Sequence, residues 1–338
     1  MNKEAYLYEK LENEKVGCNL CNHRCIIKQG AKGICGVREN REGTLFSLVY
    51  DKVIARHCDP IEKKPLFHFL PGTLSYSIAT VGCNFRCLFC QNSDISQMPN
   101  DRRIITGQSI APEQIVKDAL ATGCATISYT YTEPTIYFEL ASDTARVAAS
   151  KGIRNVFVSN GYMTEESLDF IHPDLHAANI DLKSFNDGFY RRQCGARLDP
   201  VLRTIEKMKR QGVWLEVTTL LIPGLNDSEE EIRLIARFLA GLDPDIPWHI
   251  SRFHPDYRLT DRSPTPSKSL QGAREIGLES GLKYVYTGNI PGDEGERTFC
   301  HSCGELLIDR YGFDVKAMMV NDGRCPRCGS SIPGIWWN

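Results

Sequence analysis

"SYSIATVGCNFRCLFCQN", residues 75–92, joins a predicted β-strand to a loop with three closely spaced cysteines. The first six residues are typical of a strand, and Cys83, Cys87 and Cys90 follow in C-x3-C-x2-C spacing. Three such thiolates can bind three corners of a cubane [4Fe–4S] cluster and leave its fourth iron open to a substrate or cofactor. The stretch therefore predicts an open cluster at the end of a strand. The alternatives are a zinc site completed by a distant ligand, and three unrelated buried cysteines.

The rest of the chain repeats an alternation of strands and helices. Strands are expected at residues 75–80, 125–131, 155–159, 177–182, 214–222 and 248–253, and helices at 112–123, 199–212, 226–241 and 267–281. Asp199 is expected to cap its helix, with Pro200 at the first helical position. Six βα units predict an α/β fold, a partial (β/α)6 TIM-like barrel with its chemistry at the C-terminal ends of the strands. The alternation stops after Gly288.

The cysteines divide the chain into three regions. Eleven of the 14 cysteines fall into three groups, while Cys58, Cys124 and Cys194 stand alone. Residues 1–70 are expected to form a small N-terminal metal-binding subdomain with four cysteine ligands, and residues 71–292 the barrel. Residues 293–338 are expected to form a C-terminal zinc-ribbon or rubredoxin-like module.

The bulk composition is that of a globular enzyme. The chain has 338 residues, of which 42% are hydrophobic and 24% charged, and its net charge is −2. A nucleic-acid binder would usually be basic, so no nucleic-acid partner is expected. The N-terminus lacks a secretory signal, and no apolar run is long enough to span a membrane. The protein is therefore expected in the cytoplasm, where so many cysteines point to metal rather than disulfides.

The C-terminal cysteines form two C-x2-C-G pairs, Cys300 with Cys303 and Cys325 with Cys328. Two such pairs fit a closed, four-thiolate tetrahedral site. Zinc is favoured over iron, although a rubredoxin-type pair binds either. The metal is expected to be structural, because a segment this short cannot bury enough apolar surface by itself.

The N-terminal cysteines, Cys18, Cys21, Cys25 and Cys35, are spaced C-x2-C-x3-C-x9-C. Four ligands again imply a closed site. Zinc would brace the subdomain against the barrel, whereas an iron–sulfur cluster would add an electron relay. The residue types do not separate the two. Zinc is slightly favoured, because nothing in the sequence requires a relay.

The cysteine loop "GCNFRCLFCQN" resembles the cluster loop of radical S-adenosylmethionine (SAM) enzymes. The resemblance implies that SAM chelates the open iron through its amino and carboxylate groups. Electron transfer from the cluster then cleaves SAM to methionine and a 5′-deoxyadenosyl radical, which abstracts hydrogen from a substrate. It also implies a reductase such as flavodoxin or ferredoxin.

The likeness covers about residues 70–290 and is closer to two groups within the superfamily. One is the pyruvate formate-lyase activating enzymes. Closer still is the radical SAM component of the AmmeMemoRadiSam system, whose other proteins are candidate partners. This likeness rests on the paired-cysteine tail and on "CDPIEKKPLFHFLPG", "SYTYTEPTIY", "NIDLKSF", "LLIPGLND" and "FHPDY".

Two strand ends match SAM-binding motifs of these families in part. "YTEP", residues 131–134, takes the place of a Gly-Gly-Glu-Pro motif, so Glu133 is implied to serve SAM's amino group, although Tyr131 and Thr132 replace the glycines. Alternatively, Glu133 caps the following helix. "VSNG", residues 158–161, corresponds to the Asp-Thr-Asn-Gly motif of the activating enzymes. Asn160 is then implied to bind SAM's ribose or carboxylate, or is a plain turn residue.

Further SAM contacts are implied nearby. In "DLK", alternation places Asp181 and Lys183 on the same side, pointing into the barrel. Lys183 would bind SAM's carboxylate; a structural ion pair is the alternative. His254 in "RFHPDY" matches a histidine that contacts SAM in the activating enzymes. Phe89, the aromatic residue directly before Cys90, is also expected at the cofactor.

Cys194 in "YRRQCGAR" is a more speculative catalytic candidate. The arginines around it, Arg191, Arg192 and Arg197, would bind an anion and lower the thiol's pKa. The favoured interpretation is nevertheless a buried cysteine with solvated neighbours.

Three functional hypotheses compete at this point. The first is a radical SAM enzyme that acts on an unidentified protein, peptide or small molecule. The second is a zinc-finger module that binds nucleic acid or protein without SAM chemistry, and the third is a passive electron carrier. The second is weakened because Asp309, Asp314 and Asp322 dilute the basic charge of the C-terminal knuckles. The third needs neither an open iron nor six βα units.

Overall fold

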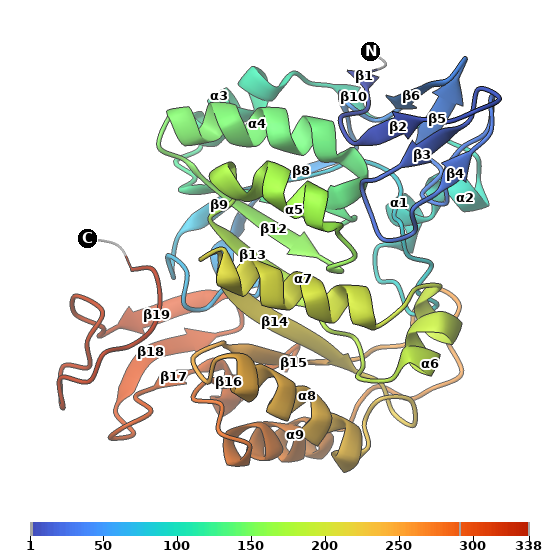
Figure 1. The fold of residues 1–338 in the computed structure, drawn as a ribbon. Coiled ribbons are helices and arrows are strands. Elements are labelled where there is room, and N and C mark those ends of the chain that lie inside the picture. Colours follow the sequence, from blue (N-terminus) through green and yellow to red (C-terminus); the bar gives the residue numbers. More distant parts are fainter. Residues whose placement is uncertain (1–2, 291, 337–338) are drawn as a thin grey trace.

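The computed structural model describes residues 3–290 and 292–336, and an eight-stranded sheet lies at its centre (Figure 1). The strand order is β16-β15-β14-β13-β12-β11-β9-β8. Seven strands are parallel, and β8 runs antiparallel to β9 at one edge. In chain order they are β8 (Ala55–Pro60), β9 (Leu74–Ala79), β11 (Thr126–Tyr129), β12 (Arg154–Ser159), β13 (Ala177–Asp181), β14 (Trp214–Leu221), β15 (Trp248–Arg252) and β16 (Val285–Gly288). The edge strands β8 and β16 do not pair with each other within these residues, so the barrel is open, and the predicted fold class is confirmed.

Two strands of this sheet go beyond the six expected from the sequence. β16 is a seventh parallel strand, only four residues long, and it ends at Gly288, where the repeating pattern was expected to stop. β8 lies within the predicted N-terminal subdomain, yet it pairs along its whole length with β9. β8 carries no strong local strand pattern and depends on its pairing with β9, whereas β16 contains typical strand formers but is only four residues long.

Helices connect the parallel strands and lie on one side of the sheet in Figure 1. They are α3 (Pro112–Ala121), α4 (Phe138–Ser150), α5 (Glu165–Ile171), α7 (Asp199–Arg210), α8 (Glu229–Leu242) and α9 (Ser267–Glu279). At α8 the Ser228 hydroxyl caps the helix by accepting from the Glu231 N–H at 3.3 Å. At α7 the expected cap was wrong by one residue: Leu198 is the cap, and the Asp199 carboxylate instead pairs with Arg203 at 2.9 Å. Within the described residues, no helix is long and apolar enough to cross a membrane.

The N-terminal region consists of small sheets packed on the barrel. One has the order β1-β6-β5 and another β2-β3-β4, while β7 pairs with β10. The strands are β1 (Lys3–Glu4), β2 (Tyr8–Lys10), β3 (Val16–Cys18), β4 (Ile26–Ile27), β5 (Arg38–Arg41), β6 (Thr44–Ser47), β7 (Lys52–Val53) and β10 (Gln108–Ser109). Arg38 on β5 forms a buried ion pair with Glu139 on α4. Apolar residues of this region join the same core as the barrel, so the two are firmly attached.

The C-terminal module covers the end of the barrel opposite the cysteine loop. Its sheet has the order β17-β18-β19, formed by β17 (Thr298–Phe299), β18 (Leu306–Tyr311) and β19 (Asp314–Met318). Glu216 lies near the start of β14 and accepts from the backbone N–H groups of Phe67 and His68 at 2.9 and 2.8 Å. Arg310 of the module lies 4.2 Å from the centre of the Phe67 ring. The module and the segment before β9 thus close the N-terminal ends of the strands.

Candidate active site

The three-cysteine loop leaves β9 through a tight turn against the N-terminal region. Gly82 has φ +106°, and a Cβ there would lie 2.8 Å from Val37, so only glycine fits without displacing a neighbour. The loop is held from the other side by backbone hydrogen bonds: the N–H groups of Arg86 and Leu88 donate to the carbonyls of Cys194 and Gln193 at 2.8 and 2.9 Å. It then enters the short helices α1 (Ser93–Ser96) and α2 (Met98–Asp101).

Cys83, Cys87 and Cys90 line one cavity of about 510 Å³ at the C-terminal ends of the parallel strands. That volume falls within the range of ordinary cofactor and substrate pockets. The strands β11 to β15, or the residues directly after them, each contribute to the lining, which includes Glu133, Ser159, Asn160, Asp181, Lys183, Thr218 and Ser251. The structure therefore brings the cysteine loop together with most of the polar residues that the sequence singled out.

The surroundings of the thiols suit metal-bound thiolates. The Phe85 N–H donates to Cys83 Sγ at 3.3 Å, and the Ser96 hydroxyl lies 3.2 Å from Cys90 Sγ. A hydrogen bond from Cys194 lowers the pKa of Cys87, which favours its thiolate form, whereas burial raises the pKa values of Cys83 and Cys90, so these two thiols need a bound metal to ionise. The donor set fits an iron–sulfur cluster held by three thiolates, with polar groups left over to hold a ligand of the fourth iron.

Glu133 connects the ends of two neighbouring strands. Its buried carboxylate accepts from the Thr135 N–H at 3.1 Å, the Ser159 hydroxyl at 2.8 Å and the Asn160 N–H at 2.8 Å. Burial raises its pKa, although these hydrogen bonds oppose the shift. Glu133 thus caps the 3-10 turn Pro134–Tyr137 and also faces the cavity, so the two interpretations of this residue are compatible.

Asn160 links the end of β12 to the cysteine loop. Its Nδ2 donates to Asn84 Oδ1 at 2.7 Å and lies 3.9 Å from Cys83 Sγ. Its Oδ1 accepts from the Tyr162 N–H at 3.1 Å, as expected of a turn residue. The side chain therefore positions the residues beside Cys83 while lining the cavity.

Asp181 and Lys183 form an ion pair at the end of β13, with 2.8 Å between Asp181 Oδ2 and Lys183 Nζ. Burial opposes the charge on Lys183, but the Asp181 carboxylate stabilises it, and the pKa of the lysine lies well above its usual value. The Lys183 N–H also donates to the Tyr190 hydroxyl at 3.0 Å. The result is a fixed ammonium group facing the cavity.

Phe89 and His254 take different positions. Phe89 is buried and lines the cavity, with Lys183 Nζ 5.9 Å from its ring centre. His254 follows β15 but is exposed and is not among the described residues that line the cavity. The position of His254 after a strand of the sheet was therefore not enough to place its side chain in the cavity.

Cys194 is fully buried behind the loop and does not line the cavity. The expectation that neighbouring arginines lower its pKa is wrong, because burial raises that pKa well above its usual value. Arg191 and Arg197 instead point to Asp187, at 2.7 and 3.5 Å. Cys194 lies in the π-helical turn Tyr190–Cys194 that follows α6 (Asp187–Phe189). The favoured interpretation of a buried cysteine fits this placement.

A set of hydrogen-bonded polar residues at the rim of the cavity was not predicted from the sequence. Asp59, at the end of β8, accepts from Lys64 at 2.6 Å, from Lys63 at 2.9 Å and from the Tyr131 hydroxyl. Lys63, Lys64 and Tyr131 all line the cavity. Burial lowers the pKa of Lys64 to about 8, although Asp59 opposes the shift. The only local signal for these residues in the sequence is the pair of lysines before Pro65. Tyr131 comes from a distant part of the chain, so its contact with Asp59 could not be predicted.

Tyr131 also has an unusual backbone. It occupies the place of a motif glycine and keeps a left-handed conformation, with φ +60°. Such a conformation costs a non-glycine residue roughly 1–2 kcal/mol. The site therefore retains the backbone geometry of a glycine while gaining a side chain that binds Asp59.

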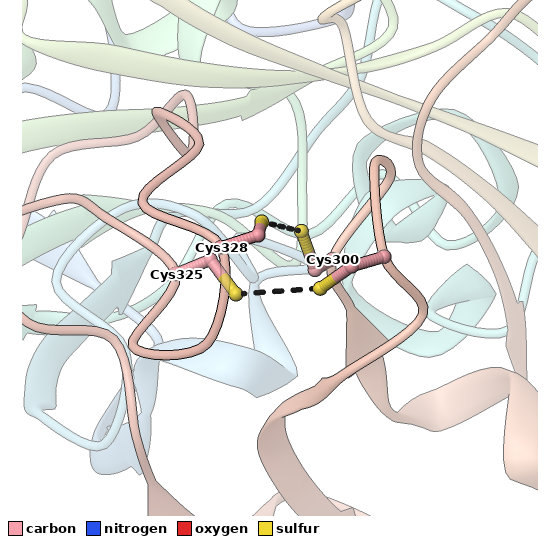
Figure 2. Close-up of side chains that lie close together, drawn as sticks. Cys300, Cys325 and Cys328 are labelled. Atoms are coloured by element: carbon pink, nitrogen blue, oxygen red, sulfur yellow. Dashed lines mark hydrogen bonds between the residues drawn. The ribbon is translucent and has the colours of Figure 1, made fainter.

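The C-terminal cysteines form a compact group (Figure 2). Cys300 Sγ lies 3.6 Å from Cys328 Sγ, and Cys303 Sγ lies 3.7 Å from Cys325 Sγ. A tetrahedral site with metal–sulfur bonds of about 2.3 Å requires sulfur–sulfur distances of about 3.8 Å. Within residues 3–290 and 292–336 this is the only set of three or more potential ligands whose atoms all lie within 4.8 Å of one another. The geometry thus fits a single metal ion.

The N-terminal cysteines are arranged differently. Cys18, Cys21, Cys25 and Cys35 all line one small cavity between the N-terminal sheets and the cysteine loop, which also contacts Asn84. Unlike those of the C-terminal group, no three of their sulfur atoms all lie within 4.8 Å of one another.

Comparisons with known proteins agree with this arrangement. A family model described as the Radical SAM superfamily matches residues 77–239. The uncharacterized protein MJ0808 of Methanocaldococcus jannaschii is 49% identical over 333 residues, 98% of each chain. A putative glycyl-radical enzyme activating enzyme of that organism is 26% identical over 211 residues, 60% of this chain and 76% of that protein. The structure of Streptococcus suis SuiB bound to S-adenosylmethionine covers 71% of this chain and 56% of that chain, with a TM-score of 0.52 and 14% identity, and is similar in fold.

Proposed function

Since the chain belongs to the radical SAM superfamily and is an enzyme, we propose that Cys83, Cys87 and Cys90 hold a [4Fe–4S] cluster at which SAM is cleaved reductively. The observation that carries the proposal is the single cavity shared by these three cysteines and the polar ends of five strands. When bound there, the cluster and SAM supply methionine and a 5′-deoxyadenosyl radical, which abstracts hydrogen from the substrate.

The residues of the cavity divide the work of holding SAM. Lys183 binds the carboxylate of SAM, and Asp181 fixes the position of the lysine ammonium from 2.8 Å away. Glu133 receives the amino group, because its carboxylate faces the cavity and is already oriented by Thr135, Ser159 and the Asn160 N–H. These groups are fixed before SAM arrives, so little ordering is required on binding.

The apolar residues of the loop protect the reaction from water. Phe85 and Phe89 are both buried and both line the cavity beside the cysteines. The buried Phe89 ring also contacts Phe189, with 6.0 Å between ring centres. Apolar side chains beside the cysteines limit the access of water to this part of the cavity and so reduce side reactions of the radical with solvent.

The reductant is a small electron carrier such as a flavodoxin or ferredoxin, and the substrate is a protein, peptide or small molecule. Similarity to a putative glycyl-radical enzyme activating enzyme supports a protein substrate. Val158, Tyr131 and Thr132 depart from the motifs of standard activating enzymes, which supports a different target. Partner proteins of the AmmeMemoRadiSam system are candidates for that target.

Product analysis tests the proposal directly. Anaerobically reconstituted protein is mixed with SAM and dithionite, and methionine and 5′-deoxyadenosine are measured. We expect both products from the unmodified protein and from Cys58→Ala, which removes an exposed cysteine outside the cavity. Cys87→Ala should yield neither. If Cys87→Ala forms as much 5′-deoxyadenosine as the unmodified protein, the proposal fails.

Deuterium transfer then identifies the substrate class. Candidate proteins, peptides and small molecules are labelled with deuterium at carbon and added separately to the reaction. The true substrate passes deuterium into 5′-deoxyadenosine, which mass spectrometry detects. Transfer from a labelled polypeptide would decide for protein modification, and transfer from a metabolite would decide for small-molecule chemistry.

A further inference from the structure

The four N-terminal cysteines surround a cavity and are not gathered around the position of a single ion. Cys18 ends β3, and the other three follow in the loops around β4. All four line the same cavity, so the fold brings them together although they span 18 positions of the chain, from 18 to 35.

The spread of their sulfur atoms argues against a single metal ion. Around one tetrahedral zinc the sulfur atoms would lie about 3.8 Å apart, as they nearly do in the C-terminal group at 3.6 and 3.7 Å. The N-terminal sulfurs are not gathered within even 4.8 Å of one another, although all four belong to the described residues. In a cubane each cysteine binds a different iron, so its four sulfurs stand further apart than around one ion. The three sulfurs of Cys83, Cys87 and Cys90 are likewise spread.

Two residues that line the same cavity carry buried hydrogen-bond donors without partners. Arg38 is 2% exposed, and its terminal nitrogens bind Glu139, but its Nε–H has no acceptor. Asn84 is 1% exposed, and its Nδ2 also lacks an acceptor. Both residues line the cavity. Buried donors without acceptors are costly, and sulfur atoms of a cluster would accept from them, as is common around iron–sulfur centres.

From these observations we propose that Cys18, Cys21, Cys25 and Cys35 bind a second [4Fe–4S] cluster, with Arg38 and Asn84 donating to its sulfur atoms. Every iron of this cluster has a protein ligand, so it offers no open position for SAM. This distinguishes it chemically from the cluster at Cys83, Cys87 and Cys90.

The second cluster lies directly beside the loop of the first. Asn84 lines the N-terminal cavity and is the residue after Cys83. His23 lines that cavity too, and its Nε2 is 2.8 Å from the Asn84 carbonyl oxygen. The Asn84 side chain reaches Asn160 of the active site at 2.7 Å. A continuous path of bonds and hydrogen bonds thus joins the two sites.

Metal analysis of a variant that lacks the first cluster tests the second. The full chain carrying Cys83→Ala, Cys87→Ala and Cys90→Ala is purified anaerobically, and its iron, acid-labile sulfide and zinc are measured. We expect about four iron and four sulfide per chain to remain, because a [4Fe–4S] cluster contains that number. Its dithionite-reduced EPR signal should not change when SAM is added. Zinc without sulfide in this variant would overturn the proposal.

The unmodified protein gives an independent measurement if the triple variant does not fold. It should contain about eight iron and eight sulfide per chain, and SAM should alter only one of its two reduced EPR signals. A single cluster whose signal responds to SAM would overturn the second cluster while leaving the proposed function intact. Two clusters whose EPR signals both stay unchanged when SAM is added would instead contradict the proposed function.

Discussion

Lys183 Nζ lies 2.8 Å from Asp181 Oδ2, and both side chains face the cavity that the three-cysteine loop lines. The pair keeps an ammonium group charged in a largely buried place. We predict that Lys183→Gln raises the dissociation constant of SAM at least about tenfold, because a charge-assisted hydrogen bond contributes roughly 1.5–3 kcal/mol. Calorimetry under anaerobic conditions measures the affinity. Lys316→Gln is the matched control, since it removes a lysine from an exposed pair with Asp314 at 3.1 Å. Equal loss of affinity in both variants would contradict the role of Lys183.

The left-handed backbone at Tyr131 leads to a second prediction. Tyr131→Ala loses the hydrogen bond to Asp59 and keeps the strain of φ +60°, whereas Tyr131→Gly loses the bond but removes the strain. We expect the glycine variant to be more stable than the alanine variant by about 1 kcal/mol. Urea unfolding of the two variants measures the difference. Equal stabilities would mean that position 131 carries no backbone strain.

Lys64 is predicted to lose its proton at pH about 8, because burial lowers its pKa from 10.5. Between these pH values the unfolded chain binds more protons than the folded one, so Lys64 makes stability rise with pH in that window. Asp59 opposes the shift by bonding the ammonium group at 2.6 Å. Removing that carboxylate in Asp59→Asn should therefore lower the pKa of Lys64 further.

Carbon-13 NMR of the lysine side chains in the oxidised protein measures this titration. The signal that is missing from Lys64→Arg identifies Lys64. A midpoint near the ordinary lysine value of 10.5 in the unmodified protein, or an upward shift in Asp59→Asn, would contradict the prediction.

The C-terminal metal is predicted to stabilise the barrel as well as its own module. Cys300 belongs to a buried cluster that also contains Phe67 and Tyr286, which lie outside the module. Cys300→Ser should abolish binding of one zinc per chain and lower the free energy of unfolding by more than about 3 kcal/mol. Metal analysis and urea unfolding provide the two measurements. Cys58→Ser, at an exposed cysteine, should change neither, and a Cys300→Ser variant of unchanged stability would show that the module is dispensable.

A relay of electrons is the role that we predict for the cluster proposed at the N-terminal cysteines. Cys25→Ala should lower the formation of 5′-deoxyadenosine strongly when reduced flavodoxin supplies the electrons. With dithionite, a small reductant that reaches the first cluster directly, the variant should remain active. The comparison is made on protein whose first cluster is verified by its SAM-sensitive EPR signal. Full activity with flavodoxin would restrict the N-terminal cluster to a structural role.

Local patterns predicted much of the fold and of the site. The C-x3-C-x2-C loop and the two C-terminal cysteine pairs each lie within a short stretch, so their spacing identified them, whereas the polar residues at the strand ends were identified by resemblance to family motifs. The six strands and four helices expected from the sequence are present, with boundaries shifted by a few residues. The edge strand β8 was missed because pairing with β9, rather than local sequence, made it a strand, and β16 was missed because it is only four residues long.

The sequence by itself determined which candidate ligands this protein carries: three closely spaced thiols predicted to hold an open cluster, two further sets of four cysteines, and charged residues at strand ends. Only the tertiary structure decided how far apart those side chains lie, and it gathered just the four C-terminal cysteines closely enough for a single ion among the residues it describes. It also buried Cys194, left His254 in solvent and joined Asp59 to Lys64 and Tyr131. The physical reason is that ligand type is a property of each residue, whereas distance, burial and pKa depend on packing between segments far apart in the chain.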